Sequence, residues 1–404
     1  MYNGKIDKKN LLSGVIFFIS PLIGLLVAMH GIKKRQLNFF YILLSLFFAL
    51  MVLKNPPLYD LIRYLDLFDS SRNIELVFHN YFSFQLVSTV FNELRIPFYF
   101  LPSLFVFFII FLHLKAIDIV YNYFDWSIKR QLLLIFGLVI LINPIFASTV
   151  LRAYLASGFF MYGVFLVIFK EKKIGYILVL FSAFFHLSFA YLIIFFILSR
   201  FFKISKNIAF VVSLFSIMFS FVFISYLIDF IPFELIKIQF SNYLTNTNTG
   251  ADSGSGNFQA FIVNSILALT NICFALLYFM NVLPKVEKAK EYSNFLNFLI
   301  ISGCLASISF IVFIRYFTHI TLFSYVYIVV FLVFINGRKI VNCLLILILC
   351  INFLLIDIYI RKDSLLNGNP ISMVLISPLQ IMFYSDEEYR KMLKIVDYQG
   401  YISK

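Results

Sequence analysis

The chain has 404 residues, of which 62% are hydrophobic and only 13% are charged. Soluble globular domains carry about 45–50% apolar and about 25% charged residues, so this composition excludes a soluble globular protein. The 54 Phe and 24 Tyr residues exclude a disordered chain. Long unbroken apolar runs also argue against a membrane β-barrel, whose strands alternate in polarity. The sequence therefore predicts an all-α polytopic integral membrane protein, with residues 1–404 forming one membrane domain.

Apolar runs of about 20 residues, enough to cross a bilayer, predict the transmembrane helices. The run 174–202 is too long for one span and carries His186 near its middle, so we predict two short helices that meet there. Together with ten other runs this gives roughly 11–12 transmembrane helices. The other runs are 11–29, 39–53, 98–114, 132–150, 153–169, 207–229, 259–281, 293–314, 317–335 and 340–358.

Positive charge on short connections predicts the orientation, because such loops mark the cytoplasmic side. Six connections carry 17 of the 33 Lys and Arg residues: 30–38, 115–130, 170–173, 200–206, 285–290 and 338–339. The segment 54–97 and the loop 231–258 are then expected on the opposite, non-cytoplasmic side. The lysines of the N-terminal tail, Lys5, Lys8 and Lys9, are the exception to this count. We interpret the net charge of +13 as the positive charge of these cytoplasmic connections and expect no nucleic-acid partner.

The segment 54–97 is too polar to span the bilayer and too apolar to be a free loop. Residues 61–68 carry an apolar stripe at helical spacing, which predicts an amphipathic helix in the membrane interface. Asp60, Arg63 and Tyr64 are spaced to share one face of that helix. Two interpretations stay open: a solvated face with a local ion pair, or a carboxylate held beside an acceptor sugar.

Two arginines stand between apolar helices at membrane depth. Arg152 follows the run 132–150 and falls near a helix N-terminus, where backbone N–H groups also favour an anion. Arg315 lies in the same way between 293–314 and 317–335. A buried arginine is costly and usually faces a cavity or a partner, although snorkelling to the interface is the alternative. Both are expected on the non-cytoplasmic side, where two guanidinium groups could hold one diphosphate.

His186 is a single imidazole in an apolar run, which is typical either of a satisfied core residue or of a catalytic group at the non-cytoplasmic helix ends. The four cysteines lie in apolar runs without metal-ligand spacing, so we interpret them as packed thiols. We expect neither a metal site nor a cofactor.

These residues give the sequence a resemblance to the bacterial polysaccharide polymerases of the Wzy and EpsG type. Asp60, Tyr64 and Phe68 resemble the family's Asp-x-x-x-Tyr-x-x-x-Phe run, and Glu75 falls where the family often has an acidic residue, although the Pro-Gly that often follows is Leu76-Val77 here. The other matching stretches are Arg152-Ala153-Tyr154-Leu155-Ala156, the basic turn 170–173, Phe185-His186-Leu187-Ser188 and Arg315-Tyr316-Phe317. Each motif is short, but their order along the chain strengthens the match.

The resemblance implies a C-type glycosyltransferase-like fold with amphipathic periplasmic helices, in the inner (cytoplasmic) membrane. It implies transfer of a growing glycan from undecaprenyl diphosphate onto the sugar of a second undecaprenyl-diphosphate-linked repeat unit at the periplasmic face. Arg152 and Arg315 would bind the diphosphate. Arg63, Tyr64 and Tyr316 would bind substrate, and Asp60, Glu75 and His186 are the alternatives for the base. A Wzz-type chain-length regulator is the expected partner, beside membrane lipid.

Two other functions are compatible with the length and the number of spans. A lipid-linked oligosaccharide flippase would be expected to show two related halves, and we find no such repeat. A membrane acyltransferase acting on glycans would be expected to have a His-centred site near the cytoplasmic side. Among polymerase products, we favour the O antigen of lipopolysaccharide over capsule or exopolysaccharide.

Overall fold

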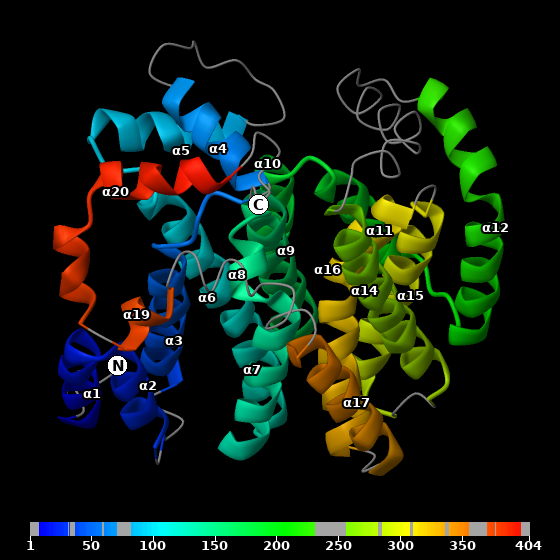
Figure 1. Cartoon of the computed structure of the whole chain (residues 1–404). Coiled ribbons are helices and arrows are strands. Elements are labelled where there is room, and N and C mark those ends of the chain that lie inside the picture. Colours follow the sequence, from blue (N-terminus) through cyan, green and yellow to red (C-terminus); the bar gives the residue numbers. More distant parts are fainter. Residues whose placement is uncertain are drawn as a thin grey trace. The chain divides into compact units, whose positions relative to one another are not determined.

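The computed structural model shows a chain that is helical nearly throughout (Figure 1). It describes residues 8–30, 32, 37–58, 60–70, 82–230, 256–281, 285–307, 310–335, 339–354, 370–375 and 377–396. No β-strand occurs within these ranges. The predicted all-α class is therefore confirmed.

The helices belong to two compact units, each described here by itself. Unit 1 comprises residues 1–135, 142–158 and 361–404, and unit 2 comprises 136–141 and 159–360. The helices α7 and α9 contribute residues to both units, and the prediction of one membrane domain stays a prediction. The N-terminal part contains α1 (Lys8–Ile19), α2 (Pro21–Met29), α3 (Leu37–Val52), α4 (Asp60–Ser70), α5 (Phe82–Glu93), α6 (Phe100–Phe124), α7 (Ile128–Ile142), α8 (Pro144–Ala147) and α9 (Leu151–Lys170).

The rest of the chain continues with longer helices and ends in short ones. In order these are α10 (Ile174–Phe185), α11 (Phe189–Phe201), α12 (Lys206–Phe230), α14 (Gly256–Phe279), α15 (Glu287–Leu305), α16 (Phe310–Tyr327), the π-helix η3 (Ile328–Ile335), α17 (Lys339–Ile351), α19 (Pro370–Leu375), the 3₁₀ helix η5 (Pro378–Phe383), α20 (Asp386–Lys391) and the 3₁₀ helix η6 (Met392–Ile395).

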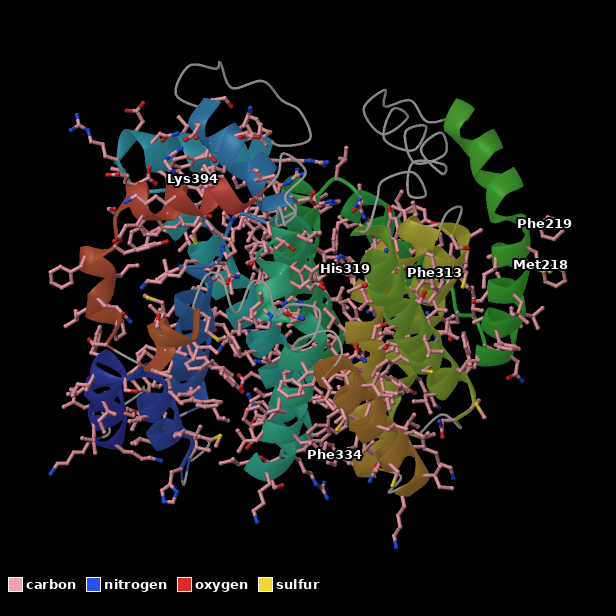
Figure 2. All side chains as sticks on the ribbon, viewed as in Figure 1. Met218, Phe219, Phe313, His319, Phe334 and Lys394 are labelled. Atoms are coloured by element: carbon pink, nitrogen blue, oxygen red, sulfur yellow. The ribbon has the colours of Figure 1, made fainter. Side chains whose placement is uncertain are left out.

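Three helical stretches among the described residues are long and apolar enough to cross a membrane: Phe100–Phe124, Leu151–Lys170 and Val312–Ile335. Six shorter apolar helices accompany them. Large apolar side chains also face outward: Met218 and Phe219 project from α12 and are 75% and 55% exposed (Figure 2). Such exposure suits a lipid environment, because lipid chains solvate apolar surface as well as a protein core does. The chain is thus an integral membrane protein, and the count of 11–12 spans stays a prediction.

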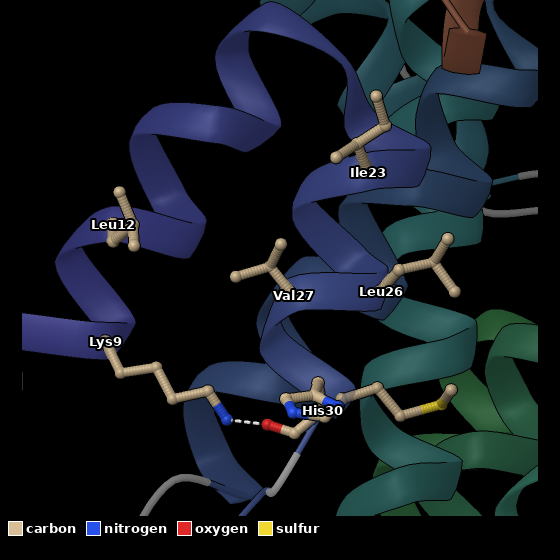
Figure 3. Close-up of a pocket in the computed structure, with 7 residues that line it drawn as sticks. Lys9, Leu12, Ile23, Leu26, Val27 and His30 are labelled. Carbon is tan, nitrogen blue, oxygen red and sulfur yellow. Dashed lines mark hydrogen bonds between the residues drawn. The ribbon is translucent and has the colours of Figure 1, made fainter.

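The first predicted span, 11–29, is wrong, because this run folds into two short antiparallel helices. α1 ends at Ile19, Ser20 is extended, and Pro21 begins α2. Proline cannot continue a preceding helix without losing a hydrogen bond, but it is suited to the first turn of a new one. A Cβ on Gly24 would lie 2.4 Å from the Cα of Phe17, so a glycine lets the two helices approach. Lys9 Nζ donates to the carbonyl of His30, and both ends of this hairpin therefore lie together (Figure 3).

The predicted span 132–150 is also interrupted. α7 ends at Ile142, and Asn143 adopts a left-handed conformation with φ 46°, which asparagine tolerates better than most residues. Its side chain accepts a hydrogen bond from the backbone N–H of Phe146 at 3.0 Å and begins the short helix α8. α9 then begins at Leu151, so Arg152 lies in the first turn of a helix, as predicted.

The run 174–202 forms two helices, α10 and α11, and the predicted break at His186 is confirmed. The predicted boundary at Arg315 is wrong. α15 ends at Leu305 and α16 begins at Phe310, so Arg315 lies within a helix. An arginine does not have to end an apolar helix if its side chain leaves the packed face, and Arg315 is exposed. The connection predicted over 115–130 is shorter, because α6 continues to Phe124.

Three of the predicted cytoplasmic connections come together in unit 2. Lys288 lies 2.6 Å from Glu171, and Arg200 lies 3.2 Å from Glu291. The hydrogen bond from Lys288 lowers the pKa of the Glu171 carboxyl. These ion pairs join the basic segments 170–173, 200–206 and 285–290, which is the grouping that the charge pattern predicts.

Aromatic rings form the interior of unit 2. Phe160 lies with its ring centroid 5.7 Å from Phe189, 5.8 Å from Phe323 and 6.3 Å from Phe295. All four side chains are buried, and most of the pairs are edge-to-face, the arrangement that ring quadrupoles favour. This interior fixes the first turns of α11 against α15 and α16.

Candidate functional site

Arg152 is a buried cation in unit 1. Its side chain is only 8% exposed, in the first turn of α9. Arg152 Nε donates to the hydroxyl oxygen of Tyr64 at 3.4 Å, and the guanidinium carbon lies 5.8 Å from the centre of the Tyr64 ring. Tyr64 comes from α4, 88 residues earlier in the chain. The structure thus joins two of the predicted site residues.

α4 places its polar and apolar residues on different sides. Leu61, Tyr64, Leu65 and Phe68 are buried, whereas Arg63 points outward and lies 3.6 Å from Asp60 with its side chain 69% exposed. Asp60 and Arg63 therefore form a local ion pair on a solvated face, which is the first of the two interpretations given for this helix. The prediction that Tyr64 shares their face is wrong, because the apolar stripe extends over Tyr64 and turns its ring inward.

A polar contact joins the end of α3 to the segment before α9. Asn55 Nδ2 donates to Ser148 Oγ at 3.3 Å, and both side chains are buried. Ser148 also donates to the carbonyl of Ile145 at 2.6 Å. This contact fixes the chain four residues before Arg152.

Among the described residues of unit 1, eight buried side-chain oxygens have no hydrogen-bond partner, and four of them lie on α5 or just after α3: Asn55 Oδ1, Ser83 Oγ, Gln85 Oε1 and Ser88 Oγ. The other four belong to Ser45, Gln131, Asp386 and Tyr389. Ser83, Gln85 and Ser88 lie on α5, whose Phe84 ring is 4.6 Å from the Tyr64 ring. A buried polar atom without a partner costs about 1–3 kcal/mol, so native proteins keep few of them away from functional sites. These residues were not predicted from the sequence; the three on α5 form the pattern Ser-x-Gln-x-x-Ser, in a helix that also carries Thr89, Asn92 and Glu93.

In unit 2, His186 ends α10 and faces the first turn of α11. Its Nδ1 lies 2.5 Å from Ser188 Oγ, and its ring centroid lies 6.3 Å from that of Phe189. Phe189 in turn lies 5.2 Å from the ring of His319 on α16, which is buried (Figure 2). His319 was not predicted, although it stands four residues after Arg315 and so one helical turn from it.

The other predicted residues of unit 2 lie on the same part of α16. The Tyr316 ring is 5.5 Å from that of Tyr191 on α11, and Tyr191 donates to the carbonyl of Ser302 at 3.0 Å. The structure therefore gathers His186, Arg315 and Tyr316 at the start of α11 and the first half of α16.

The predicted site residues thus fall in both units. Asp60, Arg63, Tyr64 and Arg152 belong to unit 1, and His186, Arg315 and Tyr316 belong to unit 2. Glu75 and most of the loop 231–258 lie outside the described residues. The pairing of Arg152 with Arg315 on one diphosphate stays a prediction. Within the described ranges, no group of three or more His, Cys, Asp or Glu side chains has the arrangement of a metal site.

Apolar helices of spanning length, together with a guanidinium held at a buried helix N-terminus, define a helical membrane protein with a polar site. A family model described as the EpsG family matches residues 37–369, and the chain belongs to this family. The predicted resemblance is confirmed, and the family places the chain among polymerase-like enzymes of polysaccharide biosynthesis. No match was found among curated proteins or among solved structures.

Proposed function

We propose that this protein polymerises a polysaccharide from lipid-linked repeat units at the periplasmic face of the inner membrane. A growing glycan moves from undecaprenyl diphosphate onto a hydroxyl of a repeat unit that is itself linked to undecaprenyl diphosphate. The observation that carries the proposal is Arg152, a buried cation at a helix N-terminus in a membrane enzyme of this family.

The chemistry explains why a buried arginine is needed. A bond forms between the acceptor oxygen and the anomeric carbon, and the bond from that carbon to the diphosphate oxygen breaks. The diphosphate leaves with the bonding electron pair, so negative charge grows on its oxygens. Arg152 and the backbone N–H groups of the first turn of α9 stabilise that charge. The acceptor proton goes to a base, for which Asp60, Glu75 and His186 stay the alternatives.

The unpartnered oxygens of Asn55 and of α5 suit an acceptor sugar. Sugar hydroxyls donate and accept hydrogen bonds, and Asn55, Ser83, Gln85 and Ser88 offer neutral groups of the matching kind. Arg63, on the outward side of α4, would contact the substrate directly, and Tyr64, on the buried side, would act on it through Arg152. In unit 2, we assign Arg315 to the diphosphate and Tyr316 to the substrate. A Wzz-type regulator as partner, and O antigen as the product, belong to the same proposal.

Substitution of Arg152 tests the proposal. Arg152→Ala is expected to lower the rate of chain transfer by about 10²–10³-fold, which is the usual effect of removing one charge-stabilising donor. Arg152→Lys keeps the charge but loses the planar fork, so an intermediate loss is expected. The assay follows conversion of a synthetic lipid-diphosphate-linked repeat unit into polymer by the purified protein in liposomes. Arg130→Ala, on the exposed start of α7, is the matched control. Wild-type rates from Arg152→Ala would overturn the assignment.

A further inference from the structure

The C-terminal residues 377–396, called here the C-terminal strap, run along unit 1 and reach α4. The strap contains η5, α20 and η6. It lies beyond residue 369, where the match to the family ends. Its contacts connect it to three N-terminal elements that precede it by about 300 residues or more.

Three polar anchors fix the strap. Ser377 Oγ donates to the carbonyl of Phe18 at 2.6 Å, at the end of α1. Tyr99 donates its hydroxyl proton to the carbonyl of Tyr384 at 2.9 Å, just before α6. Arg390 donates from both terminal nitrogens to the two oxygens of Asp69 at 2.7 and 2.8 Å, near the end of α4.

The contact between Arg390 and Asp69 has the geometry of a strong ion pair. The fork of the guanidinium matches the carboxylate, and such bidentate pairs fix orientation as well as distance. Arg390 Nε also donates to Asp386 at 2.6 Å, which ties the arginine to the first turn of its own helix. The hydrogen bond to Asp69 raises the pKa of the Arg390 guanidinium. Because this side chain is held by two carboxylates, it has one geometry.

Aromatic rings also pack between the strap and α4. Tyr389 is fully buried, and its ring lies 5.9 Å from that of Phe98. Phe98 lies 5.4 Å from Phe68, one helical turn after Tyr64 on α4. The strap thus contacts the C-terminal half of α4 through a charged pair and through a row of rings.

α4 needs such support, because it has only 11 residues. Isolated helices shorter than about 12–15 residues are marginal in water, so tertiary contacts decide their position. α5 holds the same half of α4, because the carbonyl of Phe68 accepts a hydrogen bond from Asn92 of α5 at 2.8 Å. The strap and α5 therefore both hold the C-terminal half of α4, the helix that carries Tyr64.

We propose that Arg390 is a positioning residue: through Asp69 it fixes α4 so that Tyr64 holds Arg152 in the orientation that binds the diphosphate. This inference rests on the proposed function and deepens it. It holds that a residue outside the region matched by the family model sets the geometry of the diphosphate site. Arg390 itself does not touch the substrate.

The test uses the full chain in liposomes, with Arg390→Lys and Asp69→Asn as single variants. The reversed pair, Asp69→Arg with Arg390→Asp, also carries Asp386→Asn, because the Asp386 carboxylate that holds Arg390 would repel a carboxylate at position 390. Each single variant is expected to slow polymer formation about 10-fold in kcat, with KM for the repeat unit within twofold, since small misplacements of a catalytic group are costly. Amide hydrogen exchange in residues 60–70 is expected to become faster. The reversed pair is expected to recover most of both properties. Lys391→Gln, which removes an exposed ion pair with Glu387 one turn away, is the control and is expected to change neither.

The two readouts separate the inference from the proposed function. The role of Arg390 would be overturned if amide hydrogen exchange in residues 60–70 were unchanged in both single variants. It would also be overturned if this exchange became faster while the rate of polymer formation stayed unchanged. If the wild-type protein forms no polymer, the proposed function fails, and exchange still decides whether Arg390 holds α4. If a single variant does not accumulate, the reversed pair decides: failure to restore accumulation and exchange would refute the pairing.

Discussion

Tyr64 offers the sharpest test of how Arg152 is held. The hydrogen bond between them is long, at 3.4 Å, against about 2.7–3.2 Å for most bonds of this kind. It should therefore contribute only about 0.5–1 kcal/mol. Since about 1.4 kcal/mol corresponds to a tenfold change in rate, Tyr64→Phe is expected to slow chain transfer by about 2–5-fold.

The ring of Tyr64 should matter more than its hydroxyl. The guanidinium carbon lies 5.8 Å from the ring centre, within the range of a cation–π contact. Phenylalanine keeps this contact, worth about 1 kcal/mol, and leucine loses it. Tyr64→Leu is therefore expected to slow transfer by about 10–30-fold, still less than Arg152→Ala.

The assay is the initial rate of polymer formation in liposomes at saturating repeat unit, with Tyr123→Phe on the exposed face of α6 as the control. If Tyr64→Phe costs as much as Arg152→Ala, the hydroxyl acts on the substrate directly and the argument from the arginine is refuted. If Tyr64→Leu is as active as wild type, the ring does not orient Arg152.

Two further predictions concern stability. Lys206, buried at the start of α12, donates to the carbonyls of Tyr278 and Asn281, the latter at 2.7 Å, and lies 4.1 Å from the Tyr278 ring centre. Lys206→Met should cost about 2–4 kcal/mol and lower the melting temperature by about 5–10 °C, because the carbonyls at the end of α14 lose their donor. Gly24→Val should cost about 1–3 kcal/mol, because the added side chain collides with the backbone of Phe17. Both are measured by thermal unfolding in detergent.

Matched variants distinguish these effects from general damage. Lys203→Met removes an exposed lysine three residues before Lys206 and should leave the melting temperature unchanged. A Cβ on Gly14 lies 3.4 Å from its nearest neighbour, so Gly14→Ala should be nearly neutral. A Lys206→Met protein as stable as wild type would show that the carbonyls of α14 find another donor. A neutral Gly24→Val would show that the hairpin is not closely packed.

The sequence predicts helices well where an apolar run coincides with one packed helix. The run 39–53 corresponds to α3, and the break at His186 follows from length alone. Apolarity does not distinguish one span from two short antiparallel helices, however, because both bury the same side chains. The local signals at residues 11–29 were Pro21 and Gly24, a helix start and a small residue for close approach.

The candidate site was predictable only in part. Arg152 stands out because a charge in an apolar region is costly and is kept for a reason. Its contact with Tyr64 depends on how α4 packs, which no local pattern specifies. The pairing of Arg390 with Asp69 joins residues 321 positions apart, and each alone resembles an ordinary surface charge. Such contacts are set by tertiary structure, so they become visible only in coordinates.

The hairpin of α1 and α2 also removes the one exception to the charge pattern. If residues 11–29 crossed the membrane, Lys8 and Lys9 would lie on the side opposite to the basic segment 30–38. In the structure Lys9 contacts His30, so the two ends of the hairpin lie on one side. The N-terminal lysines and the sequence Lys33-Lys34-Arg35, three residues after His30, then agree with the positive-inside rule. The side of the membrane on which α4 lies stays part of the proposed function.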